Sequence, residues 1–369
     1  MSHEAVLGLD SQRKETEPIP GSIGYIFSGQ GFSPRSILYG HQEALSAINP
    51  LVVRRNIKLM EKASGLPLSE YIRKSDESVL GKTHVVQALV HALHLAAIEL
   101  LEPYLSDLNQ IAKIAGHSGG EIAGFVASGA LSPKDSAKLI AKRGSAMHEA
   151  SVNTKSGLII PYKIDRQQTE IILIDTKAVM EKYRSMSFSD AMQTDNRELL
   201  KLVAEAEQIS MEELWQNLQE DYAISLALAN EQDVNVIGGT ETALAFARQI
   251  AIKNGVRRMQ RVDAEGGFHT KAMQEAADLF RPIFKQVVLR KPRIPVVLNN
   301  GVETTDPEEM RETHIDRMTR PVNWVSAMRR FANIETVVKI GPRGQVPGIS
   351  EANGIPKERQ VDIVNFLKG

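Results

Sequence analysis

The chain has 369 residues, of which 42% are hydrophobic and 24% are charged, with a formal net charge of −1 and no cysteine. These proportions are typical of a globular protein with a buried core, and the length allows one large domain or two ordinary ones. The near-zero net charge gives no indication of a nucleic-acid or membrane partner. The lack of cysteine excludes disulfides, a thiol nucleophile and a cysteine-ligated metal, and we expect a cytoplasmic protein without a metal site.

Residues 1–22 are polar, and we expect them to form a leader ahead of the folded part. They contain no apolar segment of the kind that a signal peptide needs. No run of about 18 apolar residues occurs in the chain, so we expect no membrane-spanning helix.

Strand-like and helix-like segments alternate from Gly24 onward, which predicts an α/β domain with a largely parallel sheet. A helix start is clearest at Ser132, because Pro133 follows as the first helical residue and Asp135 lies in the first turn. The strands are expected at residues 24–27, 111–115, 294–298 and 335–340, and the helices at residues 87–101, 132–149, 270–284 and 322–332.

A second unit interrupts this domain at about residues 151–262. Its expected strands are residues 157–164, 223–229, 233–239 and 256–262, and its expected helices are residues 175–186, 191–218 and 241–254. Apart from the polar, acidic middle helices, the order is β-α-β-β-α-β, which is the ferredoxin-like pattern. We therefore expect an α/β-hydrolase-like large domain with a mostly parallel sheet at residues 23–150 and 263–369, and an inserted ferredoxin-like small domain at residues 151–262.

The stretch from Gly116 to Gly120 fits the pattern G-x-S-x-G, with Ser118 between a predicted strand and a predicted helix. This is where a nucleophile elbow lies in a hydrolase-like sheet, and the helix that follows directs its free amides at the serine. The alternative interpretation of the local sequence is a plain strand-to-helix turn in which Ser118 caps the helix.

A nucleophilic serine needs a base, and the chain has nine histidines. His91 and His94 lie on an apolar helix and are expected to pack there. His117 adjoins Ser118, but neighbouring side chains on an elbow point apart. His269 lies in "AEGGFHTKAM", on a glycine-rich loop before a helix, from which it can reach into a cleft.

Five motifs follow one another in the order found in one enzyme family. They are residues 27–31 (FSGQG), residues 83–89 (THVVQAL), residues 116–121 (GHSGGE), Arg143-Gly144 with Met147, and residues 267–269 (GFH). Weaker matches are residues 230–239, 294–300, 320–324 and 340–346. On these motifs the chain resembles malonyl-CoA:acyl carrier protein transacylases and the related discrete, trans-acting acyltransferases of polyketide synthases, over nearly all of its length from Gly24.

The resemblance implies a ping-pong acyl transfer by Ser118 and His269, from a coenzyme A thioester to the phosphopantetheine thiol of an acyl carrier protein. It implies that the backbone N–H groups of Gln30 and Gly119 form the oxyanion hole, and that a backbone carbonyl near Arg317 orients the histidine. It also implies that no cofactor is bound, because both substrates bring their own reactive groups. The resemblance further implies substrate-binding roles for Arg143, Gln87, Phe268, His117 and Asn230.

Arg143 lies at the edge of an apolar helical stripe formed by Ile140, Gly144 and Met147, and it is expected to face inward. A buried arginine keeps its charge and needs a partner. The partner is either a protein carboxylate or the free carboxylate of a malonyl-type group. Phe268 resembles the malonyl-selective members of the family, in which a bulky ring leaves little room for an α-branch.

Some features depart from the family pattern. Gly119 and Gly120 replace Leu-Gly, which predicts a roomier pocket, and the insertion is longer around residues 191–221. A polyketide role is therefore as plausible as a fatty-acid role. A thioester hydrolase with the same Ser118 and His269 is the alternative function, and Arg143 favours the transferase. A non-catalytic docking module is disfavoured by the intact serine and histidine.

A basic cluster occurs where the insertion rejoins the large domain. It is either a docking site for an acidic carrier protein or a solvated edge. Its residues are Lys253, Arg257, Arg258 and Arg261.

Overall fold

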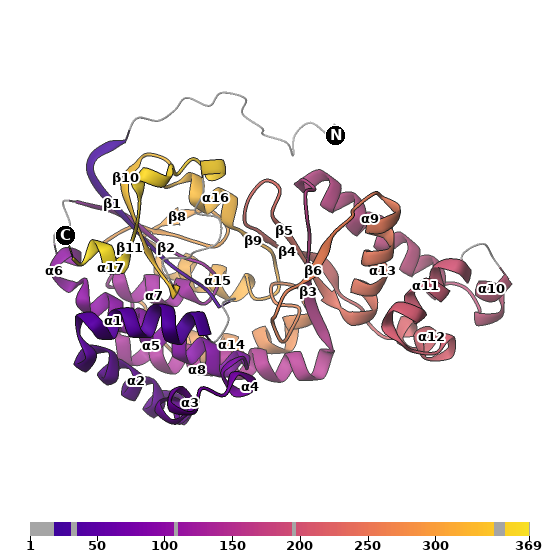
Figure 1. The fold of residues 1–369 in the computed structure, drawn as a ribbon, viewed down its shortest axis with the longest axis horizontal. Coiled ribbons are helices and arrows are strands. Elements are labelled where there is room, and N and C mark those ends of the chain that lie inside the picture. The colour runs from indigo at the N-terminus through magenta and orange to yellow at the C-terminus, as the bar shows by residue number, and fades with distance from the viewer. Residues whose placement is uncertain (1–17, 31–34, 107–109, 194–196, 343–350, 369) are drawn as a thin grey trace.

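The computed structural model describes residues 18–30, 35–106, 110–193, 197–342 and 351–368. Most of the expected leader and the end of the match at residues 340–346 lie outside these ranges. The described chain forms two sheets with helices packed on them, as Figure 1 shows. It is an α/β fold, as expected.

The first sheet is six-stranded in the described residues, in the order β11-β10-β1-β2-β7-β8. All neighbouring strands are parallel except β7 and β8, which pair antiparallel. The strands are β1 (Ile19–Phe27), β2 (Ile111–Gly116), β7 (Val296–Val297), β8 (Glu303–Thr304), β10 (Ile334–Ile340) and β11 (Gln360–Asp362).

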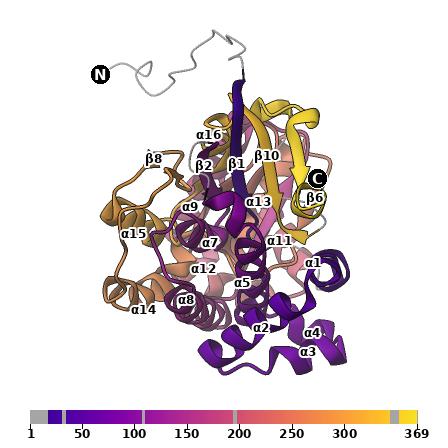
Figure 2. The same cartoon turned by 90° about the vertical axis from the view of Figure 1, so that its left-hand side faces the viewer.

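Alternation along β1 divides the core between the two faces of this sheet, because successive side chains of a strand point to opposite sides. Tyr25 and Phe27 belong to the main core cluster, together with the apolar faces of α2 (Pro50–Ser64), α5 (Thr83–Leu100) and α8 (Pro133–Thr154). Ile26 packs on the other side, near Trp324 of α16 (Trp324–Arg329). Figure 2 shows α5, α8 and α2 stacked below the strands.

Helix α5 is the most deeply buried of these helices. It is long and apolar enough to cross a membrane by length and composition, but 78% of that 18-residue window is buried inside the protein. We therefore interpret α5 as the core helix of this fold, because it packs between α2 and α8.

The second sheet is five-stranded in the described residues, in the order β6-β3-β5-β4-β9. Its strands are β3 (Ser156–Pro161), β4 (Ile224–Ala229), β5 (Asn235–Thr240), β6 (Met259–Arg261) and β9 (Val322–Asn323). Helices α9 (Arg166–Arg184) and α13 (Glu241–Lys253) cover it with a separate core cluster. Helices α10 (Phe188–Gln193), α11 (Arg197–Glu207) and α12 (Met211–Gln219) extend beyond it at one end of the molecule (Figure 1).

The remaining helices are short or lie at the edges of the first sheet. They are η2 (Ser36–Gln42), α1 (Glu43–Ile48), α3 (Leu68–Lys74), α4 (Glu77–Leu80), α6 (Glu102–Leu105), α7 (Gly120–Ala127), η3 (Lys271–Met273), α14 (Gln274–Lys285), α15 (Pro307–Asp316), η5 (Glu351–Asn353), η6 (Lys357–Arg359) and α17 (Ile363–Phe366).

Several expected helices differ from those observed, and four of them show why. The helix expected at residues 175–186 begins at Arg166, because Asp165 and Gln168 form a capping box that the prediction missed. The helix expected at residues 191–218 is three separate helices. The helix expected at residues 322–332 begins only at Trp324, because residues 322–323 pair with β4 as strand β9. Helix α8 begins at Pro133 with Ser132 as its cap, as expected, but it runs on to Thr154.

Candidate active site

Ser118 lies on a sharp turn between β2 and α7. Its φ is +52°, in the left-handed region that a non-glycine residue adopts only under constraint. The turn is tight enough that a Cβ at position 116 would lie 2.2 Å from the backbone of Gly120. The glycines are therefore required by the close approach of the two arms of the turn, and the arrangement is that of a nucleophile elbow.

The loop after β1 presses against this elbow through backbone contacts. A Cβ at Gly29 would lie 2.8 Å from the carbonyl oxygen of His117, and a Cβ at Gly120 would lie 2.3 Å from that of Ser28. The backbone N–H groups of Gln30 and Gly119 donate no hydrogen bond to another described residue. Two such amides beside a serine hydroxyl have the composition of an oxyanion hole.

His269 contacts the serine directly, with 2.9 Å between its Nε2 and Oγ of Ser118. Its Nδ1 lies 2.5 Å from the carbonyl oxygen of Arg317. A carbonyl only accepts hydrogen bonds, so Nδ1 donates its hydrogen and Nε2 presents a lone pair to the serine. Burial lowers the pKa of His269 to about 3, against a raising effect of the Arg317 carbonyl, so the ring is a neutral base at physiological pH.

Arg143 reaches the same hydroxyl from α8. Its Nη2 lies 3.3 Å from Oγ of Ser118, and its Nη1 donates to Oε1 of Gln87 at 2.8 Å. The side chain is 2% exposed, and in the part of the chain that the structure describes it forms no ion pair and its Nε has no partner. Burial lowers the pKa of Arg143 to about 10, partly offset by Glu121, so the guanidinium is charged at neutral pH.

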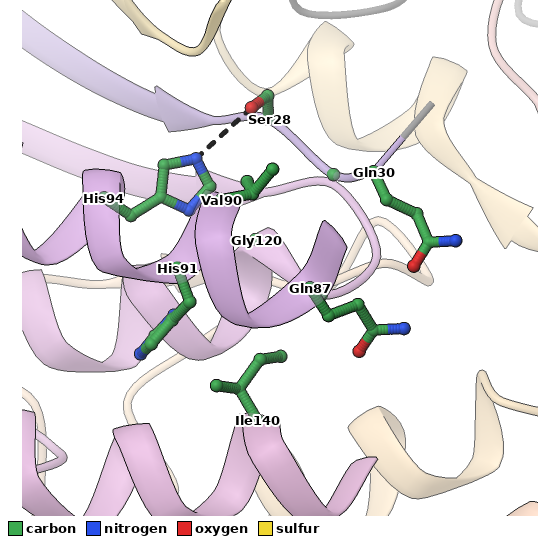
Figure 3. Close-up of a pocket in the computed structure, with 10 residues that line it drawn as sticks. Ser28, Gln30, Gln87, Val90, His91, His94, Gly120 and Ile140 are labelled. Atoms are coloured by element: carbon green, nitrogen blue, oxygen red, sulfur yellow. Dashed lines mark hydrogen bonds between the residues drawn. The ribbon is translucent and has the colours of Figure 1, made fainter. Parts of the chain in front are cut away.

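A pocket of about 240 Å³, part of it open to solvent, adjoins this group (Figure 3). Gly119 is part of its wall: a Cβ there would lie 3.2 Å from Nη1 of Arg143 and 3.5 Å from Cδ1 of Ile140. A side chain at this position would crowd the guanidinium, so the glycine lets Arg143 approach the elbow, and the roomier pocket stays a prediction. The pocket is lined by Ser28, Gly29, Gln30, Gln87, Val90, His91, His94, Gly119, Gly120 and Ile140.

Of the predicted substrate-binding residues, only Gln87 is among those that line the pocket. His117 and Asn230 are buried and hydrogen-bonded to each other, with 3.2 Å between Nε2 and Oδ1. Phe268 is 4% exposed and belongs to the main core cluster. The structure therefore brings Ser118, His269, Arg143 and Gln87 into one group, with Gln30 and Gly119 beside it.

The sequence reasoning missed a network that supports the elbow from behind. Oδ1 of Asn299 accepts from the backbone N–H of Ser118 at 2.9 Å. The N–H of Asn299 donates to Oε1 of Glu121 at 2.8 Å, and Oε2 of this fully buried carboxylate lies 2.6 Å from Nδ1 of His314. Glu121 follows the elbow directly, but its partners are more than 170 residues away in the sequence.

No group of three or more metal-ligating side chains occurs in the described ranges. The candidate site is built from a serine, a neutral histidine, an arginine and backbone amides. This set is suited to acyl transfer through a serine ester.

In the comparisons with known proteins, residues 24–181 match the family model for the acyl transferase domain. The malonyl CoA-acyl carrier protein transacylase of Bacillus subtilis strain 168 is 25% identical over 330 residues, which are 89% of each chain. The resemblance to this group of transacylases that the motifs indicated is thereby confirmed.

Solved structures show the same fold. The chain matches the malonyl transacylase of Mycobacterium tuberculosis with a TM-score of 0.71 at 20% identity, covering 94% of this chain and 100% of that one. It also matches, with a TM-score of 0.68 at 19% identity, the malonyl-transacylase of a type II polyketide synthase solved in complex with its acyl carrier protein, covering 92% and 94% of the two chains.

Proposed function

We propose that this protein is a transacylase that moves a malonyl or related carboxyacyl group from coenzyme A to the phosphopantetheine thiol of an acyl carrier protein. The observation that carries the proposal is the meeting of His269 and Arg143 on Oγ of Ser118, at 2.9 and 3.3 Å. One contact supplies a base for the nucleophile. The other places an arginine without a carboxylate partner beside the acyl group that the serine would carry.

The first half-reaction forms an acyl-serine. Oγ of Ser118 attacks the thioester carbonyl while Nε2 of His269 takes the hydroxyl proton. The N–H groups of Gln30 and Gly119 donate to the oxyanion of the tetrahedral intermediate. Collapse of the intermediate breaks the C–S bond, and the imidazolium of His269 returns its proton to the leaving coenzyme A thiolate.

The second half-reaction reverses these roles with a different thiol. His269 takes the proton of the carrier protein's phosphopantetheine thiol, the sulfur attacks the acyl-serine, and Ser118 recovers its proton from the imidazolium. The carbonyl of Arg317 holds the ring in the required tautomer throughout. All reacting groups belong to this chain or to the two substrates, so the proposed reaction uses no bound cofactor.

The free carboxylate of the acyl group is the proposed partner of Arg143. A planar guanidinium binds a carboxylate through two parallel hydrogen bonds, and the unpartnered Nε of Arg143 leaves a donor for this purpose. Gln87 fixes the guanidinium from the other side, at 2.8 Å. This arrangement favours the transferase over the hydrolase alternative, as do the names of the relatives.

The proposed function includes a division of the chain into two domains. We propose that the first sheet and its helices form an α/β-hydrolase-like catalytic domain, and that the β3–β6 segment forms a ferredoxin-like insertion that makes one wall of the acyl cleft. The run of α8 to Thr154 supports a boundary a few residues after residue 150. We also propose a cytoplasmic location, which the lack of cysteine favours. On the resemblance to the family, we propose that the substrate contacts His117, Asn230 and Phe268.

The basic cluster where the insertion ends is a proposed docking site for the acidic carrier protein. Arg258 stacks on the ring of Tyr162 at 4.6 Å, and Arg261 donates to Glu241 at 2.7 Å. Of the four cations only Arg261 is paired with a described carboxylate, so Lys253, Arg257 and Arg258 are left to steer a partner.

The test is to incubate the protein with malonyl-CoA, measure its intact mass, and then add a phosphopantetheinylated carrier protein. A malonyl adduct should form and then move to the carrier protein. Ser118→Ala should form no adduct. An adduct that persists in this variant, or one that is lost to water and never reaches the carrier protein, would contradict the proposal.

A further inference from the structure

The loop that carries His269 needs external support, because its backbone is strained. His269 has a φ of +63°, in the left-handed region. Such a conformation costs on the order of 1 kcal/mol or more and persists only where the surroundings fix it. We call residues 263–270 the histidine loop.

The backbone of the histidine loop contacts two serine side chains. The N–H of Gly267 donates to Oγ of Ser156 at 2.9 Å, at the start of β3. Gly266 lies so close to α8 that a Cβ there would be 2.2 Å from Oγ of Ser151. Both contacts tie the loop to the region where α8 ends and the second sheet begins.

Glu265 makes the third contact, and it reaches two different helices. Its Oε2 accepts from the backbone N–H of Thr83 at 2.6 Å, at the start of α5. The same oxygen lies 2.8 Å from Nδ1 of His148, on α8. Both partners are far away in sequence, and the carboxylate is 28% exposed.

These two helices are the ones that carry the acyl-binding side chains. Gln87 lies one turn after Thr83 on α5, and Arg143 lies just over one turn before His148 on α8. Glu265 itself lies four residues before His269. One side chain thus connects the base of the reaction with both helices that present the proposed carboxylate site.

The charge of Glu265 is favoured by its position. Burial alone would raise the pKa of this carboxyl group, but the hydrogen bonds from Thr83 and His148 lower it below its usual value. The N-cap residue of α5, Lys82, provides no side-chain hydrogen bond to the helix. Glu265 therefore supplies the cap that the helix lacks, from a different part of the chain.

We propose that Glu265 is a positioning residue, which holds the histidine loop in register with α5 and α8 so that His269 meets Ser118. The inference rests on the proposed function for its consequence in catalysis. Loss of the contacts of Glu265 with Thr83 and His148 should raise the activation free energy for the attack of Ser118. This increase should exceed the loss in free energy of unfolding.

A second glutamate provides a matched control. Glu61 also accepts from the first turn of a helix without a cap of its own, at 2.7 Å from the N–H of Ser69 in α3, and it contacts Lys58 at 2.6 Å. It lies on α2, and none of these contacts involves the catalytic group. Glu61→Ala should therefore reproduce the loss of a cap without displacing His269.

The experiment measures the rate at which phenylmethanesulfonyl fluoride inactivates Ser118, because this reaction needs the serine and histidine but not coenzyme A. We expect Glu265→Ala to slow inactivation about tenfold or more, since small displacements of reacting groups have effects of this size, and Glu61→Ala to leave it unchanged. Equal rates in the two variants would overturn the inference.

Two further variants separate positioning from capping. Lys82→Ser introduces a local cap for α5, so the double variant Lys82→Ser/Glu265→Ala should recover thermal stability but still react slowly. Full recovery of the rate would show that Glu265 only caps the helix. His148→Phe keeps that cap in place and should slow inactivation as well, and an unchanged rate in this variant would also contradict the inference. A wild-type protein that reacts with the sulfonyl fluoride but not with malonyl-CoA would overturn the proposed function instead.

Discussion

The two sides of the candidate site are built in different ways. On the elbow side, Ser118 and Gln30 are placed by backbone geometry. The glycines next to them, Gly29, Gly116 and Gly120, sit where a Cβ would lie 2.2–2.8 Å from backbone atoms. On the arginine side, Arg143 and Gln87 are placed by side-chain contacts between two packed helices. The elbow side can be recognised in the sequence by its glycines. The arginine side cannot, because it depends on the packing of α5 against α8. Substitutions should therefore act differently on the two sides.

The largest effect is expected at the base that faces the elbow. His269→Ala should slow acylation of Ser118 by about 10²-fold or more, because the serine loses its general base. Rapid-quench measurement of adduct formation from malonyl-CoA would give the rate. A variant that acylates at the wild-type rate would show that another group accepts the proton.

The backbone-built side is tested by adding single methyl groups. Gly120→Ala places a Cβ 2.3 Å from the carbonyl oxygen of Ser28, so the elbow must shift. We expect about 1–3 kcal/mol less free energy of unfolding and a slower acylation, as for other overpacked sites.

Gly119→Ala is its matched partner. Its Cβ would meet side chains and no backbone, at 3.2 Å from Nη1 of Arg143 and 3.5 Å from Cδ1 of Ile140, so the elbow should keep its shape. Denaturant unfolding of the two variants gives the comparison. Equal losses of stability would contradict the distinction between the two glycines.

Much of the elbow side could be predicted from the sequence, because it rests on local chemistry. The glycines around Ser118 and Gln30 and the strand-to-helix context identified the turn, and the histidine loop was marked by its own glycines. The cap at Ser132 located α8 for the same reason.

The rest depends on contacts between distant segments. Asn299 and His314 reach Glu121 across more than 170 residues, and Glu265 reaches Thr83 across 182. No local pattern contains such a pairing. The short strand β9 was read as part of a helix for the same reason, since only its pairing with β4 makes it a strand.

A smaller effect is expected at the basic cluster. Arg257→Glu with Arg258→Glu should raise the KM for the carrier protein about fivefold, as expected from the loss of about 1 kcal/mol of surface attraction, and leave hydrolysis of the acyl-serine unchanged. Lys201→Glu on α11 is the control for a general change in charge. A KM that does not change in the double variant would place the docking surface elsewhere.

The smallest effect concerns pH. The free enzyme should lose no activity through His269 between about pH 8 and pH 5, where an unperturbed histidine would become protonated. The pKa of about 3 means that the neutral, active ring persists until the solution is much more acidic. The pH profile of kcat/KM for malonyl-CoA measures this. A fall in kcat/KM near the ordinary histidine pKa would contradict this, because it would mean that burial does not keep the ring of His269 neutral.

The central claim is that Arg143 is held for the carboxylate of the substrate, and single-turnover acylation of Arg143→Ala by malonyl-CoA and acetyl-CoA tests it most directly. We expect the variant to lose malonyl transfer and to keep or gain acetyl transfer. The change in selectivity should be about 2–5 kcal/mol, which is typical when one partner of a buried charge pair is removed. If a folded variant loses transfer of both acyl groups equally, Arg143 supports the structure of the site and does not select the substrate.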